Sequence, residues 1–191
     1  MAYNPDIQHR RSIRLKGYDY TQPGMYFVTI CAYQRQCIFG DIVDGQMVLN
    51  QYGSIVAQTY QWLSQRYHYV YLDEWIIMPN HFHGIIVIID TPRRGSSRTA
   101  PTSTVPIQNI STSSNHVSKP KPLGRLIGAF KTVSTKHINI LRDTPATPVW
   151  QRNYYEHIIR NQTALDRIRE YITNNPISWQ IDQLHPNNPS K

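Results

Sequence analysis

A segment of low sequence complexity at residues 91–122 divides this chain of 191 residues into two parts. It contains seven serines, five threonines and five prolines, but no aromatic and no acidic residue. A segment of this composition buries too little apolar surface to offset the conformational entropy that is lost on ordering. We therefore expect a flexible basic insertion in a single domain, whose folded parts are residues 1–90 and 123–180. Residues 181–191 are expected to form a disordered tail.

The charge of the chain favours a polyanionic partner. Its 20 Lys and Arg residues exceed its 12 Asp and Glu residues, which gives a formal net charge of +8. Such an excess is typical of proteins that bind nucleic acid or anionic membranes. Five of the cationic residues, however, lie in the acid-free insertion. The charge therefore indicates a nucleic-acid-binding core less strongly than its total suggests.

The apolar stretches and the cysteines limit the class of protein further. The longest apolar stretch, residues 84–89, is too short to span a membrane, and the N-terminus has no apolar region of the kind found in signal peptides. Cys31 and Cys37 are too few for a disulfide scaffold or a four-cysteine zinc site, and they suit a reducing compartment. We expect a cytoplasmic protein that does not contact membranes.

The first part is predicted to be rich in strands. Runs of β-branched and aromatic residues predict strands at 24–33, 69–78 and 81–89. The dipeptide Asp44-Gly45 lies between two short apolar runs and predicts a hairpin. Apolar residues recur at helical spacing after Asn50, a residue type that caps helices well. One amphipathic helix is therefore expected to follow Asn50 as far as Tyr67.

The second part is predicted to contain two helices. Apolar residues at helical spacing predict the first from residue 123 to about residue 142, and residues 149–159 read as a strand or extended segment. Thr163, with Asp166 three residues later, resembles a capping box that opens a last helix. That helix ends at Pro176, because proline cannot continue a helix interior. The order of the elements predicts an α+β fold, an antiparallel sheet with helices packed on one face.

Two histidines at the start of the strand 81–89 are the clearest candidates for chemistry. Side chains two residues apart on a strand point to the same face, so His81 and His83 present two imidazoles side by side while Phe82 faces away. Such a pair can bind one divalent metal ion and leaves coordination positions open for a third ligand. The alternative is a pair of polar residues at a strand end, which is common for so short a motif.

The last predicted helix offers candidates for the remaining roles. Tyr171 lies beside its apolar stripe, and Asn175 follows one turn later on nearly the same face. If that face looks at the histidine pair, a phenol and a carboxamide oxygen would converge on a bound metal. The alternative for the tyrosine is half-buried packing. Spacing alone does not distinguish Tyr171 among the 13 tyrosines of the chain.

Tyr154 and Tyr155 compete with Tyr171 for any role that a tyrosine hydroxyl has in this protein. They lie in a segment that is expected to be extended, where alternation would bury one of them and expose the other. Such an arrangement suits packing or base stacking better than catalysis.

Basic residues outside the insertion are candidates for contacts with the phosphates of a nucleic acid. Those in the N-terminal arm are Arg10, Arg11, Arg14 and Lys16. Those in the second part are Arg125, Lys131, Lys136 and Arg152. Such charges position a nucleic-acid backbone without reading its sequence. A solvated surface role is the alternative for each of them.

Several motifs, in order along nearly the whole chain outside the insertion, resemble those of the REP-associated tyrosine transposases. They are LKGYDYTQPGxYFVT at 15–29, Phe39-Gly40, MPNHFHG at 78–84, WQRNYYEH at 150–157 with Arg160-Asn161, and YIxxNP at 171–176. These transposases are bacterial members of the single-tyrosine HUH superfamily, named for a His-hydrophobic-His motif. Each motif is weak by itself, and the combination is specific.

The resemblance implies a ferredoxin-like core whose C-terminal helix carries the nucleophile. It implies that His81, His83 and Asn175 bind a divalent metal, Mg²⁺ or Mn²⁺, and that Tyr171 is the nucleophile. Many insertion-sequence relatives have Gln as the third ligand, so Asn175 departs from them toward the REP-associated branch. The resemblance therefore gives less support to Asn175 as a ligand than to the two histidines.

The implied activity is cleavage and rejoining of single-stranded DNA that contains hairpins or REP-like palindromes, through a 5′-phosphotyrosine intermediate, by a monomer or a homodimer. Two alternatives remain. A non-catalytic single-stranded nucleic-acid-binding protein on the same fold would bind without metal and would not cleave. A small-molecule metalloenzyme that uses the histidine pair would turn over its substrate without any preference for hairpin DNA.

Overall fold

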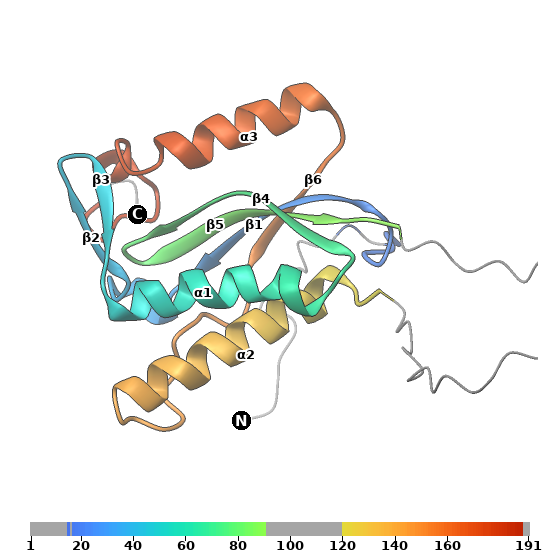
Figure 1. The fold of residues 1–191 in the computed structure, drawn as a ribbon. Helices are drawn as coiled ribbons and strands as arrows, with labels where there is room; N and C mark the ends of the chain where they lie inside the picture. Colours follow the sequence, from blue (N-terminus) through green and yellow to red (C-terminus); the bar gives the residue numbers. More distant parts are fainter. Residues whose placement is uncertain (1–14, 16, 91–119, 189–191) are drawn as a thin grey trace, which may run out of the picture.

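A computed structural model of the chain describes residue 15 and residues 17–90 and 120–188 (Figure 1). Most of the predicted insertion at 91–122 lies outside the described residues. So do four candidate DNA contacts, Arg10, Arg11, Arg14 and Lys16. None of the helices in the described ranges combines the length and the hydropathy that a membrane span requires.

A four-stranded antiparallel sheet in the order β4-β5-β1-β6 forms the centre of the fold. Its strands are β1 (Gly24–Cys31), β4 (Val70–Met78), β5 (His81–Ile88) and β6 (Tyr155–Ile159). The two residues Pro79 and Asn80 join β4 tightly to β5, as the sequence predicted. The predicted strand at 149–159 is shorter than expected, because Trp150 makes only an isolated bridge to Ala32 before β6 begins.

A separate hairpin of β2 (Gly40–Val43) and β3 (Gln46–Leu49) lies at one end of the sheet (Figure 1). Asp44 and Gly45 form its turn, both with positive φ, at 50° and 73°. Positive φ at both central residues is the requirement of a type I′ turn, which explains the Asp-Gly dipeptide. A short 3₁₀ helix, η1 (Tyr33–Arg35), precedes the hairpin.

Helices α1 (Gln51–Arg66) and α2 (Leu123–Leu141) cover one face of the sheet (Figure 1). The side chain of Asn50 caps α1 by accepting hydrogen bonds from the backbone N–H groups of Tyr52 and Gly53. Buried aromatic residues from both helices and from β5, including Tyr60, Phe82 and Phe130, form the main core.

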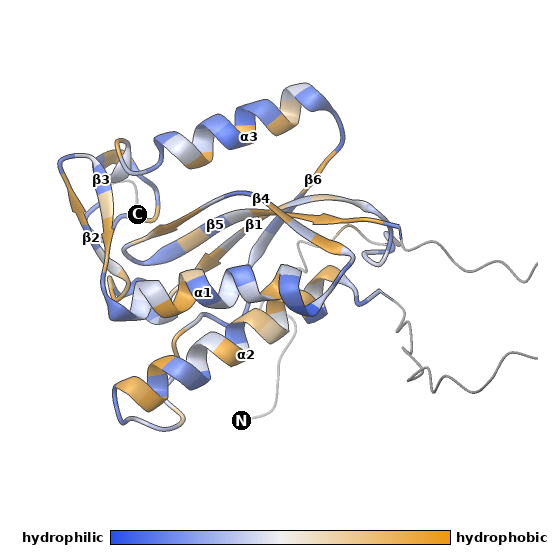
Figure 2. Ribbon diagram, in the orientation of Figure 1, coloured by the Kyte–Doolittle hydropathy of each residue, from blue (hydrophilic) through white to orange (hydrophobic). Residues whose placement is uncertain are grey.

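Helix α3 (Gln162–Asn174) covers the opposite face of the sheet, and a 3₁₀ helix, η2 (Trp179–Ile181), follows it (Figure 1). A smaller core of Phe27, Ile85, Ile159, Leu165 and Ile172 joins α3 to the sheet. In Figure 2 the ribbon of α3 is mostly polar with a few apolar patches, as expected of a helix that buries one stripe.

The α+β class with an antiparallel sheet is confirmed. The expectation that the helices pack on one face holds for α1 and α2, whereas α3 covers the other face. The side chain that caps α3 is Asn161, which accepts from the N–H of Ala164, rather than the expected Thr163. Residues 181–188 also differ from the disordered tail that we expected. Ile181 ends η2, residues 183–187 form turns and a bend, and the carbonyl of Leu184 accepts a hydrogen bond from the Asn80 side chain.

Candidate metal and nucleophile site

His81 and His83 lie on the face of β5 that looks at α3, and both are buried. Alternation along the strand places them there, since Ile85 on the same face belongs to the core under α3 while Phe82 belongs to the other core. Their ring centroids are 4.5 Å apart. The structure therefore brings the two imidazoles together as the His-x-His spacing predicted.

The proton position on His81 follows from its neighbour Asn80. The Nδ2 group of Asn80 donates to the carbonyls of Arg35 and Leu184, at 3.2 and 2.8 Å. These two acceptors require the amide nitrogen on that side, so Asn80 Oδ1 faces His81 Nδ1, at 2.8 Å. His81 Nδ1 must therefore carry the hydrogen, which leaves a free lone pair on Nε2.

His83 is held between β1 and α3. Its Nδ1 lies 2.8 Å from the hydroxyl Oγ1 of Thr29, which is its pairing partner on β1. Its Nε2 lies 3.2 Å from the hydroxyl of Tyr171. Phe27 stacks on the imidazole at a centroid distance of 5.5 Å and fixes the plane of the ring.

Tyr171 and Asn175 reach the histidines from α3 and its C-terminal cap. Tyr171 is half exposed at 47%, whereas Asn175 is buried. Among the described residues, Asn175 Oδ1 and His81 Nε2 are buried atoms that make no hydrogen bond. Burial of unsatisfied polar atoms is costly, and the Asn175 side chain is close enough to His81 to influence its pKa. A carboxamide oxygen and an imidazole lone pair are suitable donors for a divalent cation. The donors present thus fit a metal site.

Asp182, just after η2, is a further potential ligand that the sequence analysis missed. One ligand atom each from His81, His83 and Asp182 lie within 4.8 Å of one another. The Asp182 carboxylate is 4.0 Å from His81 Nε2. Trp179 packs against the His81 ring, at a centroid distance of 5.9 Å, and this contact helps to hold the turn that carries Asp182.

Burial sets the protonation of the site. It lowers the pKa of His81 to about 4, against the charge of Asp182, which raises it. Burial also lowers the pKa of His83 well below its usual value, and the neighbouring His81 adds to this. Both imidazoles are therefore neutral near pH 7, the form that binds metal. Burial, and then Asp182, raises the pKa of Tyr171, so its phenol is protonated at neutral pH.

The candidate DNA contacts in the second part are not gathered at this site. Arg125 and Lys136 are exposed on α2, which lies on the other face of the sheet, and Arg152 is exposed before β6. Lys131 is partly buried, and its amine donates to the carbonyls of Gln151, Arg152 and Asn153. Its amine thus holds the loop before β6, and a contact with DNA stays a prediction.

The competing tyrosines are divided as alternation predicted. Tyr154 packs against the main core, with the Lys131 amine 5.6 Å from its ring centroid. Tyr155 is 50% exposed on the α3 face of β6. Within the described ranges, Tyr171 is the tyrosine whose hydroxyl lies within hydrogen-bonding distance of a candidate ligand, His83.

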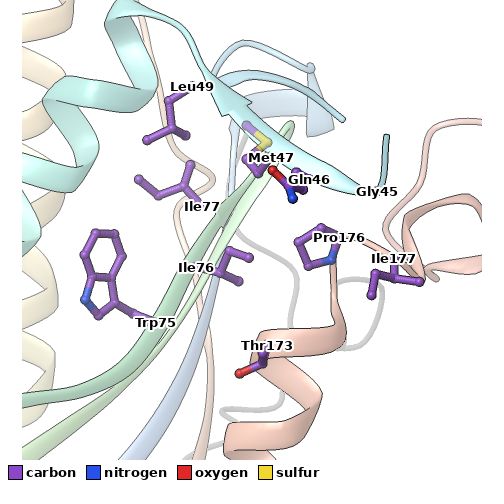
Figure 3. A pocket seen from close by; sticks show the side chains of 10 residues that line it. All are labelled: Gly45, Gln46, Met47, Leu49, Trp75, Ile76, Ile77, Thr173, Pro176 and Ile177. Carbon is purple, nitrogen blue, oxygen red and sulfur yellow. The ribbon is translucent and has the colours of Figure 1, made fainter. Parts of the chain in front are cut away.

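An apolar cavity of about 420 Å³ lies between the β2–β3 hairpin, β4 and the end of α3. Figure 3 shows Met47, Trp75, Ile76 and Pro176 around it. Neither histidine of the pair lines this cavity, so it is distinct from the candidate site.

Comparison with known proteins finds a relative in sequence and solved structures that are similar in fold. No protein-family model matches the chain. An uncharacterized protein of Haemophilus influenzae is 41% identical over 183 residues, which cover 96% of this chain and 97% of that protein. A REP-associated tyrosine transposase, solved bound to a REP hairpin, matches with a TM-score of 0.54 at 15% identity, over 87% of this chain and 74% of that one. The second match shows a common fold.

Proposed function

Since the chain belongs to the same family as the Haemophilus influenzae protein and has the fold of a tyrosine transposase, we propose that it is a metal-dependent single-strand DNA transesterase. The observation that carries the proposal is the position of the Tyr171 hydroxyl, 3.2 Å from Nε2 of a buried histidine in a metal-type donor set. A nucleophile beside ligands of this kind is the arrangement that phosphoryl transfer to a side chain requires.

The ligands in this proposal are His81, His83 and an oxygen from Asn175 or Asp182 or both. The unsatisfied Nε2 and Oδ1 atoms support the first and third of these roles. A bound Mg²⁺ or Mn²⁺ would stabilise negative charge on the non-bridging oxygens of the scissile phosphate.

The chain supplies the nucleophile and its position. Tyr171 Oη attacks the phosphorus, an Oη–P bond forms, and the bond from phosphorus to the 3′-oxygen breaks. The proton that leaves the phenol is balanced by the proton that the departing 3′-oxygen gains. The product is a 5′-phosphotyrosine link with a free 3′-hydroxyl, and the reverse attack rejoins the strand without ATP.

The proposed substrate is single-stranded DNA that contains a hairpin, because the structural neighbour was solved with a REP hairpin. The cationic residues Arg125, Lys136 and Arg152 are exposed and remain proposed contacts to its phosphates. Such contacts would position the strand without reading its sequence.

A denaturing gel tests the proposal. Labelled hairpin oligonucleotides from the host genome are incubated with Mn²⁺ and wild type, Tyr171→Phe, His83→Ala or Tyr155→Phe as the matched tyrosine control. We expect a covalent protein–DNA band for wild type and Tyr155→Phe, and none for the other two or after EDTA. An adduct that survives in Tyr171→Phe contradicts the proposal. Binding without any adduct, insensitive to EDTA, would instead indicate a non-catalytic binding protein.

A further inference from the structure

One row of side chains crosses the α3 face of the sheet through the candidate site. Strand pairing sets Ile76 opposite His83, His83 opposite Thr29, and Thr29 opposite Tyr155. Directly paired residues on neighbouring antiparallel strands point to the same face. Tyr155 therefore lies two strands from His83, a distance of about 10 Å, on the surface that carries the site.

Helix α3 leaves the Tyr155 end of this row uncovered. The helix contacts β4, where Arg169 forms a bidentate ion pair with Asp73 at 2.8 and 2.6 Å. Along the α3 face of β6, Ile159 is buried against Leu165 of α3, whereas His157 and Tyr155 are exposed. The helix thus starts over one end of β6 and diverges from the other, as Figure 1 shows.

Tyr155 and Tyr171 open onto the same side of the molecule. Both rings contact the buried ring of Phe27 edge-on, with centroid distances of 6.3 and 6.1 Å. Both remain about half exposed, at 50% and 47%. A DNA strand that approaches Tyr171 from solvent over β1 and β6 would therefore pass the face or edge of the Tyr155 ring.

Exposed cationic residues flank β6, the strand that carries Tyr155. Arg152 before the strand and Arg160 after it are both exposed. The single acidic residue of β6, Glu156, is buried and points to the opposite face. An exposed aromatic ring with cations near both ends of its strand is the combination used to bind single-stranded nucleic acid by stacking and phosphate contacts.

We propose that Tyr155 is a stacking platform for a nucleobase of the single DNA strand whose scissile phosphate reaches Tyr171. This inference rests on the function proposed above. At a rise of about 3.4 Å for each stacked nucleotide, the 10 Å between Tyr155 and His83 corresponds to about three nucleotides. The stacked base is therefore within about three nucleotides of the scissile phosphate.

Binding measurements in a Tyr171→Phe background test the platform without interference from covalent adducts. Fluorescence anisotropy with a hairpin oligonucleotide compares Tyr155→Phe, which keeps the ring, with Tyr155→Leu, which keeps apolar contact with Phe27. We expect unchanged affinity for the first and a loss of about 5- to 150-fold for the second. Tyr71, 56% exposed on the other edge strand, supplies the control Tyr71→Leu, which should bind as the background does. Equal affinity of the Phe and Leu variants at position 155 overturns the proposal.

Abasic oligonucleotides separate stacking from a purely structural effect. An abasic nucleotide at the stacked position should make the Phe and Leu variants bind equally, whereas one placed far from the scissile phosphate should preserve their difference. A difference that persists with every abasic position within three nucleotides overturns the platform.

The outcome of these binding measurements can be told apart from a failure of the proposed function. If wild type forms no adduct with DNA, the transesterase proposal fails, while the comparison at Tyr155 still decides whether a base stacks there. If Tyr155→Phe abolishes the adduct in a protein with Tyr171 intact, the assignment of the nucleophile to Tyr171 is overturned, and the binding comparison at position 155 still decides whether a base stacks there.

Discussion

The two imidazoles of the candidate site are each fixed by a neighbour that has few alternative orientations. Asn80 is held by two backbone carbonyls and sets the hydrogen on His81 Nδ1. Thr29 holds His83 Nδ1 from the adjacent strand. When a hydrogen bond fixes one ring nitrogen, the other is oriented as a ligand, so these contacts prepare the site before metal binds.

Thr29 gives a prediction at this scale. Thr29→Val removes the hydroxyl that meets His83 Nδ1 and preserves the shape of the side chain. We expect the affinity for Mn²⁺ to fall about 10- to 100-fold, the range found when a partner of a metal-binding histidine is lost. Calorimetric titration with Mn²⁺ measures the change.

The matched control is Thr59→Val, since the Thr59 hydroxyl donates to a carbonyl of its own helix on the other face of the sheet. This variant should bind Mn²⁺ as wild type does. Wild-type affinity in Thr29→Val would show that Thr29 does not orient His83.

The four central residues of the site could be named from the sequence, whereas Asp182 could not. His81 and His83 follow from alternation on a strand, and Tyr171 and Asn175 from helical spacing together with the family resemblance. Asp182 lies beyond the last helix in a segment that had no recognisable periodicity. Its signal was Trp179, because a large aromatic residue after a helix end usually packs against the fold.

At the scale of elements, the position of α3 determines where Tyr171 lies. Its apolar stripe packs on Phe27 and Ile85, and the Arg169–Asp73 ion pair joins it to β4. The sequence placed all helices on one face of the sheet. The apolar run at 84–89 instead indicates that both faces of the sheet are covered, because a strand buried on both faces is continuously apolar rather than alternating.

The ion pair of α3 gives a prediction with a defined pH dependence. Arg169 lies two residues before Tyr171, and Arg169→Met removes the ion-pair partner of Asp73. We therefore expect a lower Tm and slower adduct formation at pH 7. Arg169 lowers the pKa of Asp73 below its usual value of 3.8. Stabilisation by a carboxylate with a depressed pKa is complete above that value and is lost as the pH falls through the folded-state pKa.

Thermal unfolding at a series of pH values from 7 to 2 measures the pH dependence of this stabilisation. The difference in Tm between wild type and Arg169→Met should be constant down to about pH 4 and then shrink. Arg167→Met, an exposed change on the same helix, should have little effect at any pH. A Tm difference that is independent of pH would argue that Arg169 acts through packing alone.

At the scale of the whole molecule, the candidate site joins distant segments of the chain. His81 and His83 come from β5, Tyr171 and Asn175 from α3 and its cap, and Asp182 from the turn after η2. A metal bound there would connect the sheet to the C-terminal segment, and it would bind the folded chain in preference to the unfolded chain.

Metal binding should therefore stabilise the protein. At a free Mn²⁺ concentration 100 times the dissociation constant, we expect about 2.7 kcal/mol of added stability and a corresponding rise in Tm. Differential scanning calorimetry with Mn²⁺ or EDTA measures the rise. His81→Ala should unfold at the same temperature in both conditions, and an equal rise in this variant would place the metal elsewhere.

The identity of the nucleophile is the central claim, and peptide mapping of the covalent protein–DNA adduct tests it most directly. Trypsin cleaves after Arg169, so Tyr171 falls in the peptide 170–191 as its single tyrosine. Tyr154 and Tyr155 fall together in the peptide 153–160. After nuclease digestion of the DNA, mass spectrometry should find the residual nucleotide on the peptide 170–191, with Tyr171 as the modified residue. A nucleotide on the peptide 153–160, or on any other, would contradict the account.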